Sequence, residues 1–322
     1  MKTIVKNLAV ILLTCLVVFV GTEIYYRWIN PEILGNTGSL SYMRWAKANF
    51  KVNSWGFRDK ERTINKSNPD IHRILVLGPS NIVGQGVTNI EERLSERLEK
   101  KLNERNPKYE VINCGDMTLD PVGSMARILS SMINNKVEFD TVVFYYSWNA
   151  IKHIPDIQAR YYQIKKSNET KKQNNPLAQY LSKHSYAYDW LSNVSQDKKL
   201  LIEGKTYNEW HLGFYQQESY FMEHIKVLNS IDKALKQNNK KMILLLTPVS
   251  YNPDERAKYL TVVEIFKKAM DVNSISYVDA TKIYDGIAEK DIPVSKYDGH
   301  NKPKYYQNMV ELLAPEILNY SK

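Results

Sequence analysis

Cysteine is nearly absent from this chain, which has only two cysteines among 322 residues. Cys15 lies in an apolar N-terminal run and Cys114 in a strand-like segment, so the two thiols are not expected to form a disulfide. The sequence also lacks any cluster of cysteines and histidines with the spacing of a zinc site. We therefore predict a fold that needs no disulfide and a protein that uses no metal and no other cofactor.

Motifs that read DNA or RNA are lacking too. The chain has 44 lysines and arginines against 35 aspartates and glutamates, a formal net charge of +9. Such a surplus can attract nucleic acid, anionic lipid or an acidic polymer. Here the lysines are scattered and no helix is rich in arginine, so we predict a solvated basic surface near a membrane and no nucleic-acid partner.

The N-terminus carries an apolar run over residues 8–20. Lys2 and Lys6 precede it, and the cluster Tyr25-Tyr26-Arg27-Trp28 follows it. Aromatic and cationic side chains are enriched at membrane interfaces, and no small-x-small cleavage site stands out. Residues 1–28 are therefore predicted to be a transmembrane anchor or, as the alternative, a signal sequence. Because the lysines should stay cytoplasmic, the rest of the chain is expected outside, in the periplasm or at the cell surface.

Residues 29–70 are polar, contain prolines and glycines, and are predicted to be an irregular stem. Beyond them, short apolar runs alternate with segments of helical periodicity. The predicted strands are 73–78, 109–114, 141–146, 241–247 and 276–279, and the predicted helices are 91–103, 122–134, 223–237, 260–272 and 304–318. This alternation predicts an α/β domain over residues 71–322, a three-layer sandwich with a central, mainly parallel sheet. A stretch rich in Tyr, Lys, Asn and Gln interrupts it at about 150–222 and is predicted to be a helical insertion.

Residues with catalytic chemistry follow the predicted strands. Ser80 follows the first strand, Gly115 the second and Asn149 the third, and His300 precedes the closing helix. Ligands bind at the carboxyl ends of the strands in parallel sheets, so we expect these residues at one edge. A serine hydroxyl attacks once a base takes its proton, which a neutral imidazole does well near pH 7. We predict Ser80 as nucleophile, His300 as its base and Asp298 as the acceptor that orients His300.

An acyl-transfer site also needs donors for the oxyanion of the tetrahedral intermediate. The backbone N–H groups of Ser80 and Gly115 and the side-chain amide of Asn149 are the predicted donors. A glycine at the second position would let the backbone approach closely without a side-chain clash.

The same residues carry a resemblance to a known family. In order, the sequence resembles the blocks that characterise SGNH (GDSL-like) hydrolases at residues 73–87, 111–115, 145–149 and 297–301. The upstream segment Asn53-Ser-Trp-Gly-Phe-Arg-Asp59 is similar to one that precedes the first block in a bacterial, often membrane-anchored branch. The resemblance covers roughly residues 50–320 and implies a flavodoxin-like fold and ester chemistry through a Ser-His-Asp site.

Three features depart from the family pattern. Pro79 stands where the family usually has an aspartate before the nucleophile. Ser147 and Ala150 replace the glycine and aspartate that usually surround the asparagine. Asp298 lies two residues before the histidine, where many members place it three before.

Three functions remain open at this level. The first is an extracytoplasmic serine esterase that removes O-acyl groups, acetyl foremost, from a cell-envelope glycan or a lipid-like ester. The second is a polysaccharide O-acyltransferase with the same site, which would need an acyl donor delivered by a multispan membrane partner. The third, suggested by Pro79, is an inactive binding or scaffold module. Tyrosines of the insertion would stack on sugars, form its core or face the membrane: Tyr161, Tyr162, Tyr180, Tyr186 and Tyr188.

Overall fold

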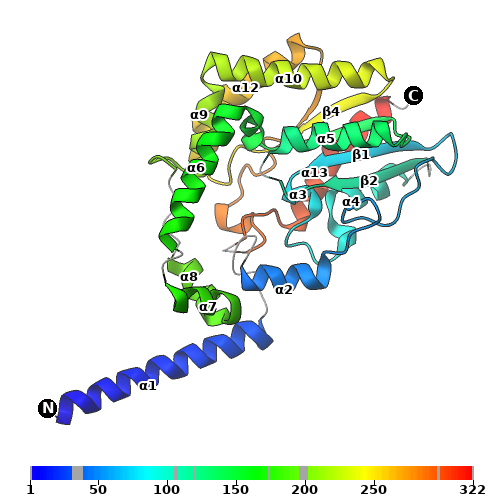
Figure 1. Ribbon diagram of the computed structural model, residues 1–322. Coiled ribbons are helices and arrows are strands. Elements are labelled where there is room, and N and C mark those ends of the chain that lie inside the picture. Colours follow the sequence, from blue (N-terminus) through cyan, green and yellow to red (C-terminus); the bar gives the residue numbers. More distant parts are fainter. Residues whose placement is uncertain are drawn as a thin grey trace. The chain divides into compact units, whose positions relative to one another are not determined.

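The computed structural model describes residues 2–30, 39–104, 108–118, 120–172, 175–195, 202–295 and 298–320. In these residues, five strands form one parallel sheet in the order β2-β1-β3-β4-β5 (Figure 1). The strands are β1 (His72–Gly78), β2 (Tyr109–Gly115), β3 (Thr141–Tyr146), β4 (Lys241–Leu246) and β5 (Ser276–Asp279). Each end lies within one residue of the apolar run that predicted it, and the order is that of flavodoxin-like sheets. The predicted fold class is confirmed.

The register of the strands sets where the site can lie. Gly78 at the end of β1 is paired with Gly115 at the end of β2, and Leu77 is paired with Phe144 of β3. The carboxyl ends of the three strands therefore share one edge of the sheet. The strand order reverses at β1, and the crevice beside such a reversal is where open α/β sheets bind ligands.

Alternate residues of each strand face opposite cores, as the two-residue period of a strand requires. Leu75, Leu77 and Phe144 pack with helices α5, α10 and α12 on one face of the sheet. Ile74 and Val76 pack with α4 and α13 on the other face. Figure 1 shows α5 and α10 on one side of the strands and α4 and α13 on the other. Both faces are covered, which explains why the strands are continuous apolar runs.

The helices confirm most of the predicted pattern and add elements to it. The α-helices are α1 (Lys2–Ile24), α2 (Leu40–Asn49), α3 (Ser80–Val83), α4 (Leu94–Leu102), α5 (Pro121–Asn134), α6 (Pro155–Lys172), α7 (Pro176–His184), α8 (Tyr186–Ser195), α9 (Tyr207–Tyr215), α10 (Glu218–Gln237), α11 (Pro253–Lys258), α12 (Leu260–Val272) and α13 (Pro303–Tyr320). The other helical segments are the π-helix η1 (Tyr25–Ile29) and the 3₁₀ helices η2 (Ile90–Glu92), η3 (Trp148–His153) and η4 (Glu289–Asp291). The insertion is helical, as predicted. The segment taken for an irregular stem contains α2.

Helix α1 continues into η1, and together they give an apolar helix over Thr3–Ile29. Its 27 residues span about 40 Å at 1.5 Å per residue, longer than the roughly 30 Å hydrocarbon core of a bilayer. The helix is thus long and apolar enough to cross a membrane, and an N-terminal signal sequence would satisfy the same criteria.

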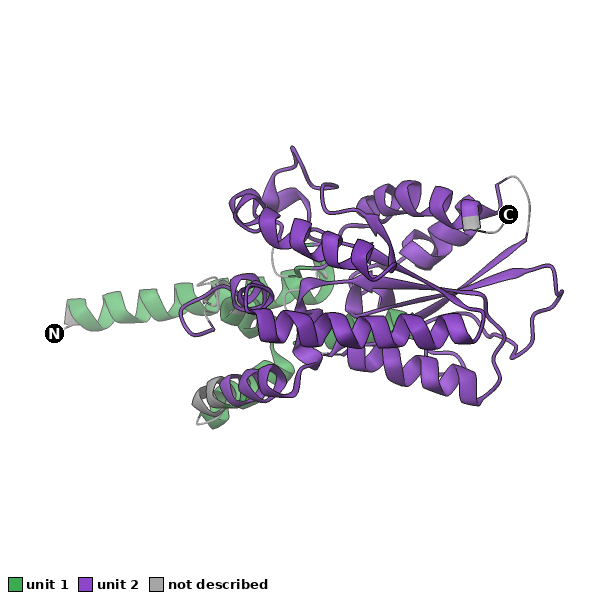
Figure 2. Ribbon diagram, turned by 90° about the horizontal axis from the view of Figure 1, so that it is seen from above, with its two compact units in different colours: residues 1–50, 166–200, 295–299 green, residues 51–165, 201–294, 300–322 purple. Residues whose placement is uncertain are grey.

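The chain divides into two compact units (Figure 2). The first comprises residues 1–50, 166–200 and 295–299, and the second comprises residues 51–165, 201–294 and 300–322. This division differs from the predicted domain boundaries, because the helical insertion contributes to both units and the compact unit that contains the sheet begins at residue 51 rather than 71.

The first unit is held together by polar contacts among its helices. The Glu23 carboxylate accepts hydrogen bonds from Ser185 Oγ at 2.9 Å and from the Ala187 N–H at 2.8 Å. Asp189, which is buried, accepts from the N–H and the hydroxyl of Ser41 at 3.0 and 2.8 Å. Helices α1 and α2 thus belong to a folded module with α7 and α8.

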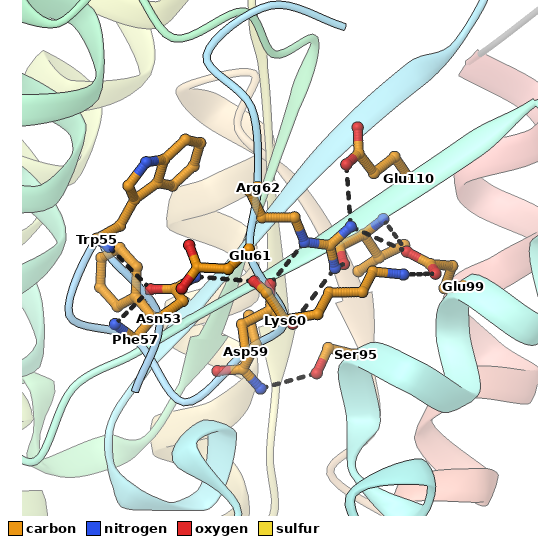
Figure 3. Close-up of polar contacts among 12 residues, drawn as sticks. Asn53, Trp55, Phe57, Asp59, Lys60, Glu61, Arg62, Ser95, Glu99 and Glu110 are labelled. Carbon is orange, nitrogen blue, oxygen red and sulfur yellow. Dashed lines mark hydrogen bonds and ion pairs between the residues drawn. The ribbon is translucent and has the colours of Figure 1, made fainter. Parts of the chain in front are cut away.

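Within the second unit, the segment before β1 is tied to the sheet by charge (Figure 3). Arg62 donates to Asp59 at 2.8 Å, to Glu110 of β2 at 3.0 Å and to the Val111 carbonyl at 2.6 Å. Burial raises the pKa of Glu110, but hydrogen bonds from Arg73 and Arg62 outweigh it and hold that pKa below its ordinary value. Nearby, the Asn53 side chain accepts from the N–H groups of Trp55 and Phe57, which closes a turn.

Candidate active site

Ser80 and His300 lie within hydrogen-bond distance although 220 residues separate them. Ser80 begins α3 directly after β1, and His300 lies in the loop before α13. The distance from His300 Nε2 to Ser80 Oγ is 2.7 Å. A serine hydroxyl that donates to a neutral imidazole at this distance is the arrangement of a nucleophile with its base. Both residues belong to the second unit, at the carboxyl edge of the sheet.

The turn that carries Ser80 is compact and needs glycine at two places. A Cβ at Gly78 would lie 2.6 Å from Ile82 Cγ1 and 2.8 Å from Tyr145 Cβ. Gly84 ends α3 with φ of 77°, a left-handed conformation that glycine adopts without strain. Pro79, with φ of −76°, fits the fixed geometry of proline, so the departure from the family's aspartate introduces no backbone strain here.

Arg58 holds this turn from outside. Its buried guanidinium donates to the carbonyls of Val83 at 3.2 Å, Gly84 at 2.7 Å and Val87 at 2.9 Å. The Arg58 carbonyl in turn accepts a hydrogen bond from Arg93. The sequence links the segment 53–59 to the site only by resemblance. These contacts give the segment a physical role, because it positions residues 78–87, the turn that carries the predicted nucleophile Ser80. We call these residues the nucleophile turn.

The loop that carries His300 is anchored through its neighbour Asn301. The buried Asn301 side chain donates to Tyr145 Oη at 3.1 Å, and its amide oxygen accepts from Tyr251 at 2.8 Å and from Tyr284 at 2.6 Å. On the other side of the site, Asn81 accepts from the Tyr306 hydroxyl through its carbonyl at 3.0 Å. His300 and Ser80, the predicted base and nucleophile, are therefore fixed to the same core. The sequence did not predict this anchoring.

Gly115 has a packing role in the structure. A Cβ there would lie 2.4 Å from the backbone nitrogen of Val83 and 2.8 Å from the carbonyl carbon of Ile82. The Gly115 N–H donates to Asn113 Oδ1 at 3.0 Å. For this N–H to bind an oxyanion, that hydrogen bond would have to be exchanged, so its predicted donor role stays a prediction.

The substitution Gly115→Ala is expected to destabilise the protein, because backbone atoms of the nucleophile turn would have to move to admit the methyl group. Overpacking of this kind costs about 1–3 kcal/mol. Chemical unfolding monitored by circular dichroism would measure the loss. Gly213→Ala is the matched control, since a Cβ there would meet no atom closer than 3.9 Å. Equal stabilities for the two variants would contradict the packing role.

Asn149 lies in η3, directly after β3. Its Oδ1 accepts from Ser147 Oγ at 2.6 Å, and its Nδ2 donates to Tyr207 Oη at 3.0 Å. Both ends of the amide are thus fixed. The partner Tyr207 begins α9, within the predicted insertion, and sequence spacing gave no indication of this contact.

A buried layer of histidine and tyrosine lies behind η3. His224 Nε2 lies 2.6 Å from Tyr146 Oη, which lies 2.7 Å from Tyr215 Oη, and His224 Nδ1 lies 3.4 Å from His153 Nδ1. Burial and the neighbouring His153 lower the pKa of His224 well below its ordinary value. Burial likewise lowers the pKa of His153, despite its hydrogen bond with the Ala150 carbonyl. Neutral imidazoles therefore make this layer a hydrogen-bonded support for η3.

Asp298, the predicted orienting acid, is fully buried, and its N–H donates to Ser295 Oγ at 3.1 Å. It belongs to the first compact unit and His300 to the second, so its pairing with His300 remains a prediction. Tyr297, which occupies the more usual position of the acid, lies outside the described residues. Among the residues that the structure describes, no three His, Cys, Asp or Glu side chains are grouped to hold a metal ion.

Comparison with known proteins finds no family model and no curated protein that matches the chain. Similar solved structures include the acetyl xylan esterase AlAXEase, with a TM-score of 0.44 and 13% identity over 76% of this chain and 99% of that one. A lipase/acylhydrolase from Enterococcus faecalis has a TM-score of 0.43 and 14% identity, over 78% of this chain and 97% of that one. The SGNH-hydrolase family esterase AlinE4 has a TM-score of 0.41 and 13% identity, over 79% and 98%. Likenesses this distant carry no argument about chemistry, for which the residues of this chain must be considered directly.

Proposed function

We propose that this chain is a membrane-anchored serine ester hydrolase of the SGNH type. It removes O-acyl groups, acetyl foremost, from a cell-envelope glycan or a lipid-like ester outside the cytoplasmic membrane. The observation that carries the proposal is the 2.7 Å contact of Ser80 Oγ with His300 Nε2 at the carboxyl edge of a parallel sheet. Support for the location comes from the apolar helix over Thr3–Ile29 and from Lys2 and Lys6, which precede its apolar run at residues 8–20.

The reaction follows from this contact. His300 Nε2 takes the hydroxyl proton of Ser80 while Oγ forms a bond to the ester carbonyl carbon. The tetrahedral intermediate collapses as the bond to the alcohol oxygen breaks, and His300 returns the proton to that oxygen. Water then attacks the acyl-enzyme with His300 again as base, the bond from Ser80 Oγ to the acyl carbon breaks, and His300 returns the proton to Oγ as the carboxylic acid leaves. Because Nε2 must accept the serine proton, the one ring proton of the neutral imidazole lies on Nδ1. This is the proton that Asp298 is proposed to bind.

The oxyanion needs donors beside Ser80. The Ser80 N–H has no acceptor bonded to it among the described residues, and Asn149 Nδ2 has a second hydrogen besides the one given to Tyr207. These two groups are the proposed oxyanion donors, with Gly115 as a third if its bond to Asn113 exchanges.

The test uses the full chain in detergent with p-nitrophenyl esters of increasing chain length, an O-acetylated polysaccharide and a fluorophosphonate. We expect hydrolysis that favours acetyl, together with fluorophosphonate labelling that peptide mass spectrometry places on Ser80. Labelling without hydrolysis would favour the O-acyltransferase, whose acceptor is then missing from the assay. If folded protein shows no labelling and no hydrolysis, the proposal is overturned in favour of a scaffold.

A further inference from the structure

The predicted oxyanion donor Asn149 is supported by two residues of the second unit that the reaction itself does not require. Its Nδ2 donates to Tyr207 Oη at 3.0 Å. The Nζ of Lys152 donates to the same phenol oxygen at 2.9 Å. Tyr207 therefore joins an ammonium group to the amide that is proposed as an oxyanion donor.

The position of Tyr207 is set by the start of α9. The Thr206 hydroxyl accepts from the Glu209 N–H at 3.1 Å, and the Glu209 carboxylate accepts from the Thr206 N–H at 3.1 Å, a capping box. The Thr206 hydroxyl also donates to Glu255 at 3.0 Å, which ties the cap to α11. Tyr207, as the first residue of the helix, is thereby held against η3.

Lys152 is an unusual lysine, since only 1% of its surface is exposed. Its Nζ lies 4.5 Å from the ring centroid of Tyr161 and 5.3 Å from that of Tyr207. Burial of an ammonium group is costly unless hydrogen bonds and aromatic faces offset the lost hydration. A cation kept in this place adds positive potential beside the atoms where an oxyanion would form.

Protonation favours the same arrangement. Burial raises the pKa of Tyr207 to about 12, although the hydrogen bond with Asn149 acts in the opposite direction. At neutral pH the phenol is therefore neutral, and its oxygen accepts from both Lys152 and Asn149.

We propose that Tyr207 and Lys152 are positioning residues for Asn149: they fix its Nδ2 so that the second amide hydrogen points at the oxyanion. The inference rests on the proposed ester hydrolysis and goes beyond it by adding two residues to the site. It also gives the insertion a role, since α9 supplies one of them.

The substitution Tyr207→Phe in the full chain, in detergent, tests this inference with p-nitrophenyl acetate. We expect kcat to fall about 10-fold to 100-fold with KM unchanged, the range typical of a misplaced catalytic group. Lys152→Met should lower kcat in the same way. The exposed Tyr162→Phe is the matched control and should keep wild-type kcat. Complete labelling with the fluorophosphonate measures the concentration of active sites. Because kcat is calculated per active site, a poorly folded fraction of the protein does not change it.

A double-mutant cycle separates positioning from general damage. In an Asn149→Ala background, Tyr207→Phe should lower kcat no further, because the group that it positions is gone. Additive losses, or wild-type kcat in both Tyr207→Phe and Lys152→Met, would overturn the inference while leaving the hydrolase intact. Absence of Ser80-dependent turnover in the wild type is a distinct result, which overturns the proposed function and the inference with it.

Discussion

Ser80→Ala is expected to lower kcat for p-nitrophenyl acetate by about a million-fold, to the level of the uncatalysed reaction plus binding effects. The reason is the 2.7 Å contact with His300, which makes Ser80 Oγ the atom that forms the acyl-enzyme. His300→Ala should cost about as much, and the double variant should be no worse than either single one, because the two residues act as a unit. Initial rates at saturating ester would measure this.

The exposed Ser130→Ala, on α5, is the matched control and should keep wild-type kcat. Each inactive variant should also keep the unfolding midpoint of the wild type to within a few degrees, since a hydroxyl or an imidazole at a half-buried site contributes little to stability. Substantial turnover by folded Ser80→Ala would remove this serine from the mechanism.

Asn149→Ala is expected to lower kcat about 100-fold to 1,000-fold, the range seen when one oxyanion donor is lost. Asn149→Asp is the sharper test, because it keeps the shape of the side chain and replaces the donor with an acceptor that repels the oxyanion. Its loss should equal or exceed that of Asn149→Ala, with KM nearly unchanged. The measurement is the dependence of rate on ester concentration for both variants.

Asn134→Ala, at the exposed end of α5, controls for loss of an asparagine as such and should behave as wild type. A normal kcat in folded Asn149→Asp would show that this amide does not face the oxyanion, and the site would have to rely on the N–H groups near Ser80 alone.

The strands could be predicted closely because the sheet is buried on both faces. Such strands are uninterrupted apolar runs, and β3 and β5 begin and end where those runs do. Helix boundaries are harder to predict where no cap marks them. Helix α10 begins at Glu218, five residues before the predicted start, and its N-cap residue Gln217 makes no side-chain capping bond. Helix α2 was missed altogether, because the prolines and glycines before it indicated loop.

The candidate site shows a similar division. Ser80, Asn149 and His300 could be proposed from the sequence because each follows a strand or precedes the last helix, and topology brings strand ends together. Nothing in the sequence distinguishes the buried Lys152 from the lysines at the surface. Its partner Tyr207 is 55 residues away, on a helix whose placement depends on the fold of the insertion. Contacts of that kind have no local periodicity that could predict them.

The Arg58 contacts bear on where the compact unit that contains the sheet begins. The sequence placed that boundary at residue 71, just before β1. Three carbonyl groups of the nucleophile turn accept hydrogen bonds from Arg58, which lies 13 residues before this boundary. A recombinant fragment cut at residue 71 would contain every strand and every proposed catalytic group, yet the turn that presents Ser80 would lack its clamp. The compact unit that contains the sheet is therefore longer at its N-terminus than the sheet itself, and residues 51–70 belong to that unit.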